Sequence, residues 1–216
     1  MVDITTQEDL SMEEAPMSED EEKLELIDES ESTERTKKVV AASVLASLSI
    51  AIAPIAQIVP RIPGWGIAIF DPVSIFWVVS FLLGGVWVGL VSSVAGTMGL
   101  FLYDPTAIGP IMKLIATLPM IIVPWLGVRR LRADVRGESL SNGRLFLKLM
   151  VIAFIVRLIL MVPINLIYGA IALPFLSMEF LATFAIILNG LQSIWDALIP
   201  FILVHRTSVF KVFKMW

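Results

Sequence analysis

Three ionisable side chains fall inside otherwise apolar stretches of this sequence: Lys113, Arg157 and Asp196. A charge in hydrocarbon is costly unless a partner compensates it, so each is a candidate for structural pairing or for function. Arg157 and Asp196 lie at similar depths in their segments, which predicts a buried intramembrane ion pair between these segments. The same pair could instead exchange partners during a transport cycle, and the sequence leaves both possibilities open.

Lys113 lies near the predicted outer end of its segment, where two structural roles are open to it. Its ammonium group could extend along the helix to reach water. Alternatively it could join three polar residues in a hydrogen-bonding set that opens outward. These are Asn165 and Asn189, which we also place in the outer half of their segments, and Gln192, one turn deeper than Asn189 on the same face. Such a set predicts a substrate-binding site for a small polar molecule.

Aromatic residues are expected at the rim of this set. Trp65 lies in a Pro- and Gly-rich stretch, 60–66, that could roof the site, and Tyr103 follows the third apolar segment. As anchors at the membrane interface these rings need no ligand. As walls of a site they would suit a flat heteroaromatic ligand, so we include both among the predicted substrate-binding residues.

The residues needed for intramembrane catalysis are not brought together by the sequence. The chain has no Cys and a single His, His205, which we place at the cytoplasmic edge, away from any intramembrane Ser nucleophile. Metal-dependent phosphatidyl transfer would need several Asp residues on adjacent helices, whereas Asp196 stands alone. We therefore expect no enzyme, no catalytic residues, no metal and no cofactor, and keep an intramembrane enzyme only as a minor alternative.

The elements that must position these residues are apolar segments. Hydrophobic residues make up 57% of the 216 residues, and the mean hydropathy is +0.85, which is typical of an integral membrane protein. A spanning helix needs about 20 apolar residues, somewhat fewer where the bilayer thins. We predict an all-α membrane protein, a bundle of six transmembrane helices at residues 39–59, 71–83, 86–102, 109–128, 147–172 and 178–204.

Charge is distributed so that both termini are predicted to be cytoplasmic. Residues 1–34 hold 14 of the 20 acidic residues and read as an acidic, disordered cytoplasmic tail, followed by a membrane domain over 35–205 and a short basic cytoplasmic C-terminus over 206–216. By the positive-inside rule, the basic clusters mark the cytoplasmic side of a multi-pass protein of the cell membrane. These clusters are Arg35, Lys37 and Lys38; Arg129, Arg130, Arg132, Arg136, Arg144 and Lys148; and Arg206, Lys211 and Lys214, against Arg61 alone on the opposite side.

Several motifs resemble the substrate-binding S component of energy-coupling-factor vitamin transporters, in its riboflavin-type form. Ala42-x-x-x-Ala46 in the first segment is similar to the small-residue motif by which such subunits dock on a partner helix. Asp71 and the turn from Gly85 to Gly89 resemble the family pattern, with Val86 where proline is usual. The stretch 109–116 resembles the start of the family's fourth helix.

The resemblance implies a six-helix fold and a subunit that captures a vitamin at the outer face. Partners would be a transmembrane coupling subunit, docked at Ala42 and Ala46, and two ATPase subunits, since this chain has no phosphate-binding loop of its own. Where riboflavin-type members carry Asn-x-x-Lys, this chain has Asn189 and Gln192, which keeps a hydrogen-bond donor but loses the charge. The resemblance makes riboflavin, or another flat and mostly uncharged vitamin, the first expectation. Thiamine, biotin and a modified-base precursor stay open, as does a non-transporting membrane scaffold. The lipid bilayer is a further expected partner, and no nucleic acid is expected.

Overall fold

The fold is entirely helical over the part of the chain that the structure describes. A computed structural model describes residues 19–64, 67–131 and 138–207, with side chains over 31–64, 67–130 and 139–207. Apart from loops and an isolated bridge between Arg61 and Ala68, these residues form five long helices and one short 3₁₀ helix. The elements are α1 (Glu19–Ile58), α2 (Val73–Leu100), α3 (Ile108–Leu131), η1 (Glu138–Ser141), α4 (Gly143–Ala172) and α5 (Met178–His205).

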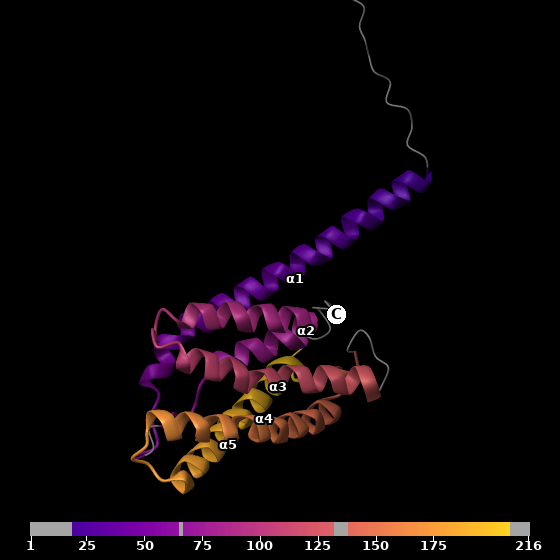
Figure 1. Ribbon diagram of the computed structural model, residues 1–216. Helices are drawn as coiled ribbons and strands as arrows, with labels where there is room; N and C mark the ends of the chain where they lie inside the picture. The colour runs from indigo at the N-terminus through magenta and orange to yellow at the C-terminus, as the bar shows by residue number, and fades with distance from the viewer. Residues whose placement is uncertain (1–18, 65–66, 132–137, 208–216) are drawn as a thin grey trace, which may run out of the picture. The chain divides into compact units, whose positions relative to one another are not determined.

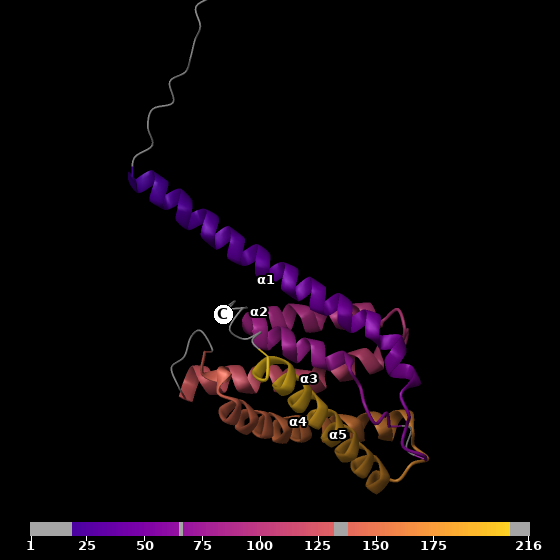
Figure 2. The same ribbon diagram turned by 180° about the vertical axis from the view of Figure 1, so that it is seen from behind.

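The five α-helices are long and apolar enough to cross a membrane, which indicates a multi-pass membrane protein. The chain divides into two compact units, Met1–Arg35 and Thr36–Trp216. Within the second unit, the loops over 101–107 and 173–177 lie at the same end of the helices, at the left of Figure 1 and the right of Figure 2. We call this end the loop end. The end of α3 and the start of α4 lie at the opposite end.

The tail predicted to be disordered is partly helical. Residues 1–18 lie outside the described residues, but from Glu19 onward the backbone belongs to α1. Glu, which is frequent here, is a good helix former, and Glu31 lies 3.5 Å from Arg35 one turn later. The helical conformation over 19–34 therefore agrees with local helix propensity, whereas our expectation of disorder came from net charge.

The second and third predicted segments form a single interrupted element, α2. Gly85 has φ 83° and ψ −178°, a non-helical conformation essentially restricted to glycine. A Cβ atom added to Gly89 would lie 2.7 Å from the Phe81 Cβ, although eight residues of continuous helix span about 12 Å. One added to Gly96 would overlap the indole nitrogen of Trp77. The chain therefore folds back on itself at Gly85, so that two halves of α2 lie side by side.

The two halves of α2, 73–84 and 86–100, are about 18 and 22 Å long at 1.5 Å per residue, shorter than a hydrocarbon core of about 30 Å. They form the centre of the second unit, since 72% of the apolar window of α2 is buried, a larger share than in any other of the five helices. Trp77, Phe81 and Leu82 are fully enclosed. The number of membrane crossings and the side on which the termini lie stay predictions.

The small residues predicted to dock a partner face the interior of the chain. Ala42 and Ala46 are 1% and 3% exposed, on the same stripe of α1 as Ser49 and Ala53. Trp77 donates its indole N–H to the Ser49 hydroxyl at 3.0 Å, so this stripe packs on α2. Small side chains let two helices approach closely, and here the partner helix belongs to the same chain. Docking of another subunit at these alanines would require α1 to separate from α2.

Cysteine labelling can distinguish a folded-back α2 from a single continuous span. We expect single cysteines at Pro63 and Pro105, both exposed loop positions, to be labelled by an impermeant maleimide from the same side of the membrane, and one at Ser141 from the other side. The chain has no native Cys, so each variant carries one thiol. Labelling of positions 63 and 105 from opposite sides would contradict the folded-back arrangement.

A candidate ligand pocket tied to a buried ion pair

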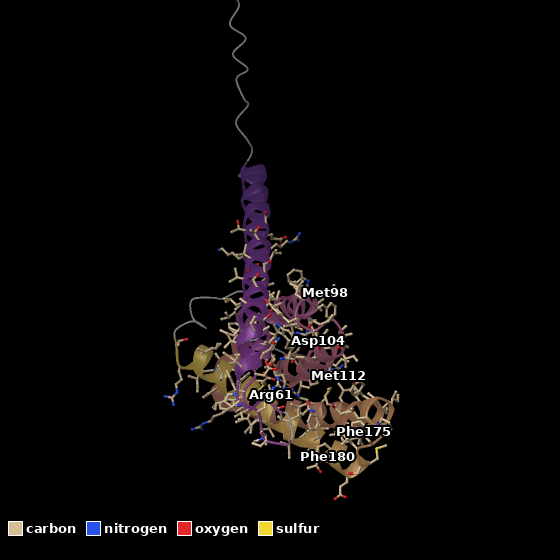
Figure 3. The ribbon with its side chains drawn as sticks, turned by 90° about the vertical axis from the view of Figure 1, so that its left-hand side faces the viewer. Arg61, Met98, Asp104, Met112, Phe175 and Phe180 are labelled. Carbon is tan, nitrogen blue, oxygen red and sulfur yellow. The ribbon has the colours of Figure 1, made fainter. Side chains whose placement is uncertain are left out.

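A cavity of about 370 Å³ lies at the loop end, between α1, α2, α3 and α5. Ile67, Leu100, Phe184 and Leu188 are among its apolar walls. Figure 3 views the molecule from this end and shows Arg61 and Asp104 on it. The polar side chains that line the cavity are Gln57, Arg61, Asp71, Tyr103, Asp104, Lys113 and Gln192.

An ion pair between Lys113 of α3 and Asp71, two residues before α2, forms part of the wall of this cavity. Both side chains are largely buried, with 20% and 12% of their surfaces exposed. The other carboxylate oxygen of Asp71 accepts a hydrogen bond at 3.1 Å from the backbone N–H of Val73, the first residue of α2. Lys113 is therefore paired with Asp71, and of the predicted set Asn165, Asn189 and Gln192, only Gln192 lines the same cavity.

The rim of the cavity is organised around Asp104, in the loop between α2 and α3. One carboxylate oxygen accepts hydrogen bonds from the backbone N–H and the hydroxyl of Thr106, and the other from the N–H of Gly109 at 3.2 Å. These bonds hold the start of α3 against the loop. Tyr103, 41% exposed, lines the cavity next to this loop, as the sequence predicts for a rim aromatic.

Below the cavity lies a buried polar network centred on Arg157. Its guanidinium Nη1 lies 2.8 Å from Asp196 Oδ2, and both side chains are 1% exposed. The guanidinium also donates from Nε to Asn189 Oδ1 at 3.0 Å and from Nη2 to Gln192 Oε1 at 2.7 Å. Ser74 of α2 donates its hydroxyl to Asp196 Oδ1 at 2.6 Å. The ion pair that the sequence predicts is thus present, and its hydrogen bonds join α2, α4 and α5.

Gln192 connects the network to the cavity, because it lines the cavity and accepts from Arg157 at the same time. The amide is oriented by this bond: its oxygen faces the guanidinium, so the NH₂ group is left for the cavity. A molecule in the cavity would therefore meet a hydrogen-bond donor here. The bound molecule would then contact Gln192, whose side chain is hydrogen-bonded to Arg157 of the ion pair.

Only some of the predicted substrate-binding residues line the cavity. Lys113, Gln192 and Tyr103 line the cavity. Asn189 is 1% exposed and belongs to the network, where its NH₂ donates to the carbonyl of Ala185 at 2.8 Å. Asn165 donates to the carbonyl of Met161, one turn earlier in α4, and does not line the cavity. Trp65 lies outside the described residues.

Two partners of these residues were missed by the sequence reasoning about the site. Asp71 neutralises Lys113, and Ser74 satisfies the second oxygen of Asp196. A signal for Asp71 was available, since it is an acid directly before Pro72 at the start of an apolar segment on the same predicted side as Lys113. For Ser74 we find no such signal, because Ser residues are frequent in these segments and only the packing of α2 on α5 selects this one.

A second hollow, of about 460 Å³, lies between α4 and α5 and is lined almost entirely by apolar side chains. Ser193 is its only polar lining residue, among Leu147, Met150, Val151, Phe154, Gly190, Ile194 and Ala197. It offers little to orient a polar ligand. Among the described residues no group of three or more His, Cys, Asp or Glu side chains is placed to hold a metal ion.

Comparison of the chain with protein-family models, with curated protein sequences and with solved structures finds no match in any of the three. The class that the structure itself defines is an all-helical, multi-pass membrane protein with a pocket of mixed polar and apolar lining at the loop end. What the pocket binds has to be argued from its chemistry.

Proposed function

We propose that this chain is the substrate-capture subunit of a membrane importer of the energy-coupling-factor type, and that it binds a small vitamin-like molecule in the pocket at the loop end. The observation that carries the proposal is Gln192, which lines the pocket and is bonded to the Arg157–Asp196 pair. Polar groups buried in a membrane protein are costly and are typical of substrate pathways.

The mixed lining of the pocket supports capture of a small molecule over a purely structural role. The polar side chains could orient a ligand, while apolar walls such as Phe184 and Leu188 would bury its rings. The Gln192 bond to Arg157 gives a route by which an occupied pocket would alter the contact of α5 with α4. A flat, uncharged vitamin, with riboflavin first, is our preferred substrate.

Uptake driven by ATP would need partner subunits. We expect one transmembrane coupling subunit and two ATPase subunits, with the chain in the cell membrane and the loop end facing outward. Since Ala42 and Ala46 are buried, on the stripe of α1 whose Ser49 bonds to α2, either α1 moves when the coupling subunit docks or the contact uses another face of the helices. Tryptophan at either alanine is expected to disturb the chain's own packing as well as any docking.

A binding assay on the purified protein tests the proposal. We expect a vitamin to co-purify in detergent, identified by visible absorbance and mass spectrometry, or to raise the unfolding temperature when added. Gln192→Leu is expected to weaken binding about tenfold or more, because the ligand loses a buried hydrogen-bond donor. Asn165→Leu, a matched change outside the pocket, should leave affinity within about twofold.

Two outcomes of this assay would redirect the proposal. Because Gln192→Leu also removes a partner of Arg157, its unfolding temperature has to be measured alongside, and Phe184→Ala, which only removes an apolar wall, serves as a second pocket variant. Equal loss in the Asn165 and Gln192 variants would place the ligand elsewhere. If no vitamin co-purifies and none shifts the unfolding temperature, a non-transporting scaffold is the better description.

A further inference from the structure

The positively and negatively charged side chains that line the pocket are equal in number, which restricts the charge of the molecule that can bind there. We infer that the pocket selects an uncharged molecule bearing a hydrogen-bond acceptor, and that the ion pair between Lys113 and Asp71 excludes anionic derivatives of the same molecule. This inference rests on the proposed function, since it names the substrate class of that pocket.

The Lys113 ammonium is already neutralised within the protein. Asp71 is bonded to it inside the protein, where both side chains are largely shielded from water. An anion approaching Lys113 would have to displace this carboxylate or share the cation with it. Displacement leaves Asp71 charged and poorly solvated, and unpairing a largely buried charge is strongly unfavourable. A neutral ligand leaves the pair intact.

At the rim, a second acid, Asp104, lines the pocket. Both carboxylate oxygens of Asp104 are held by Thr106 and Gly109, so this acid is fixed in place. Arg61, the cation of the rim, is exposed to solvent, where its field is screened by salt over about 8–10 Å. The four charged side chains of the pocket therefore sum to zero.

Gln192 determines which kind of hydrogen-bonding group on a ligand can bind in the pocket. Arg157 occupies its oxygen at 2.7 Å, so the group left for the ligand is the NH₂ donor. A carbonyl oxygen or a ring nitrogen would accept from it. An anionic group would also accept, but it would share the cavity with the carboxylates of Asp71 and Asp104. The combination favours a neutral carbonyl- or imine-bearing ring, packed on Phe184 and Leu188.

The experiment compares riboflavin with riboflavin 5′-phosphate, which share a ring and differ by an anionic group. For the full chain in detergent we expect riboflavin to bind at least about tenfold more tightly, a difference of about 1.4 kcal/mol. Asp71→Asn keeps the acceptor for Val73 and releases Lys113, so the preference for the neutral ligand should shrink about tenfold or reverse. Lys113→Gln should keep or increase the preference for the neutral ligand.

The controls separate failure of the charge argument from failure of the proposed function. Glu179→Gln removes one acid at the start of α5, outside the pocket lining, and should leave the ratio of affinities unchanged. Equal or tighter binding of the phosphate to the unmodified chain, or an unchanged ratio in a folded Asp71→Asn variant, overturns the inference alone. If neither flavin binds, the comparison is repeated with biotin and its uncharged methyl ester. Binding of neither pair rejects the proposed function, and the inference with it.

Discussion

Replacing Arg157 by leucine is expected to lower the free energy of unfolding by about 3–5 kcal/mol, because it leaves Asp196 buried without its cation. The loss is not confined to the pair. Asn189 and Gln192 each lose a hydrogen bond from the guanidinium, and Asp196 keeps only the hydroxyl of Ser74. We expect a lower unfolding temperature in detergent, measured by the change in intrinsic Trp fluorescence.

A double variant shows whether the loss comes from the unpaired charge. Arg157→Leu with Asp196→Leu removes both charges and should be more stable than either single variant, since a buried pair can often be replaced by apolar groups at little net cost. Lys148→Leu, an exposed change on the same helix, is the control and should alter stability by less than about 0.5 kcal/mol. A double variant no more stable than the singles would show that hydrogen bonds, not charge, dominate this network.

The helices could be predicted because hydropathy is read directly from the residues. The predicted bounds 178–204 and 147–172 agree closely with α5 and α4, where the apolar stretch is long and uninterrupted. The helix breaks at the predicted boundary between the segments 71–83 and 86–102, since the two adjacent glycines Gly84 and Gly85 favour a break without fixing its geometry. Sequence alone gave no rule for the fold-back, which depends on Gly89 and Gly96 fitting against Phe81 and Trp77.

The pairing of charges could be predicted better than the accessibility of the groups involved. Arg157 and Asp196 share a depth, and a lone buried charge of either sign is too costly to leave unpaired, so their contact followed from the sequence. Whether an amide faces a cavity or its own helix depends on a rotation that the sequence does not specify. Asn165 and Asn189 therefore differ from Gln192 in the structure, although all three are polar residues in apolar segments.

The prediction for Ala42 and Ala46 shows the same limit on another surface. A small-residue motif indicates that a helix can be approached closely, but it does not say by which helix. The glycine-rich half of α2 offers a partner within the chain: a Cβ atom on Gly96 would lie 2.6 Å from the Ser49 hydroxyl. Close packing inside one subunit and docking between subunits leave the same signature in a sequence.

Gly85→Ala is expected to be the most damaging small substitution outside the network. At φ 83° and ψ −178°, a Cβ atom is strained, at a cost of about 1–3 kcal/mol. Alanine is also a strong helix former, so the substitution favours a continuous helix through residue 85. A continuous α2 would separate Gly89 from Phe81 and expose the Trp77 surface that packs on α1. The unfolding temperature should fall, and the fluorescence of the Trp residues should change with it.

The control for this substitution is Gly190→Ala in α5, where an added Cβ atom has no heavy atom within 4 Å and the backbone is helical. That change should be neutral or stabilise the helix by up to about 1 kcal/mol. In a Gly85→Ala protein that still folds, a cysteine at Pro105 reports which conformation α2 has taken. Labelling from the side opposite to Pro63 would mean that α2 has straightened into one span, and unchanged labelling with unchanged stability would show that the glycine conformation at residue 85 is not what holds the fold-back.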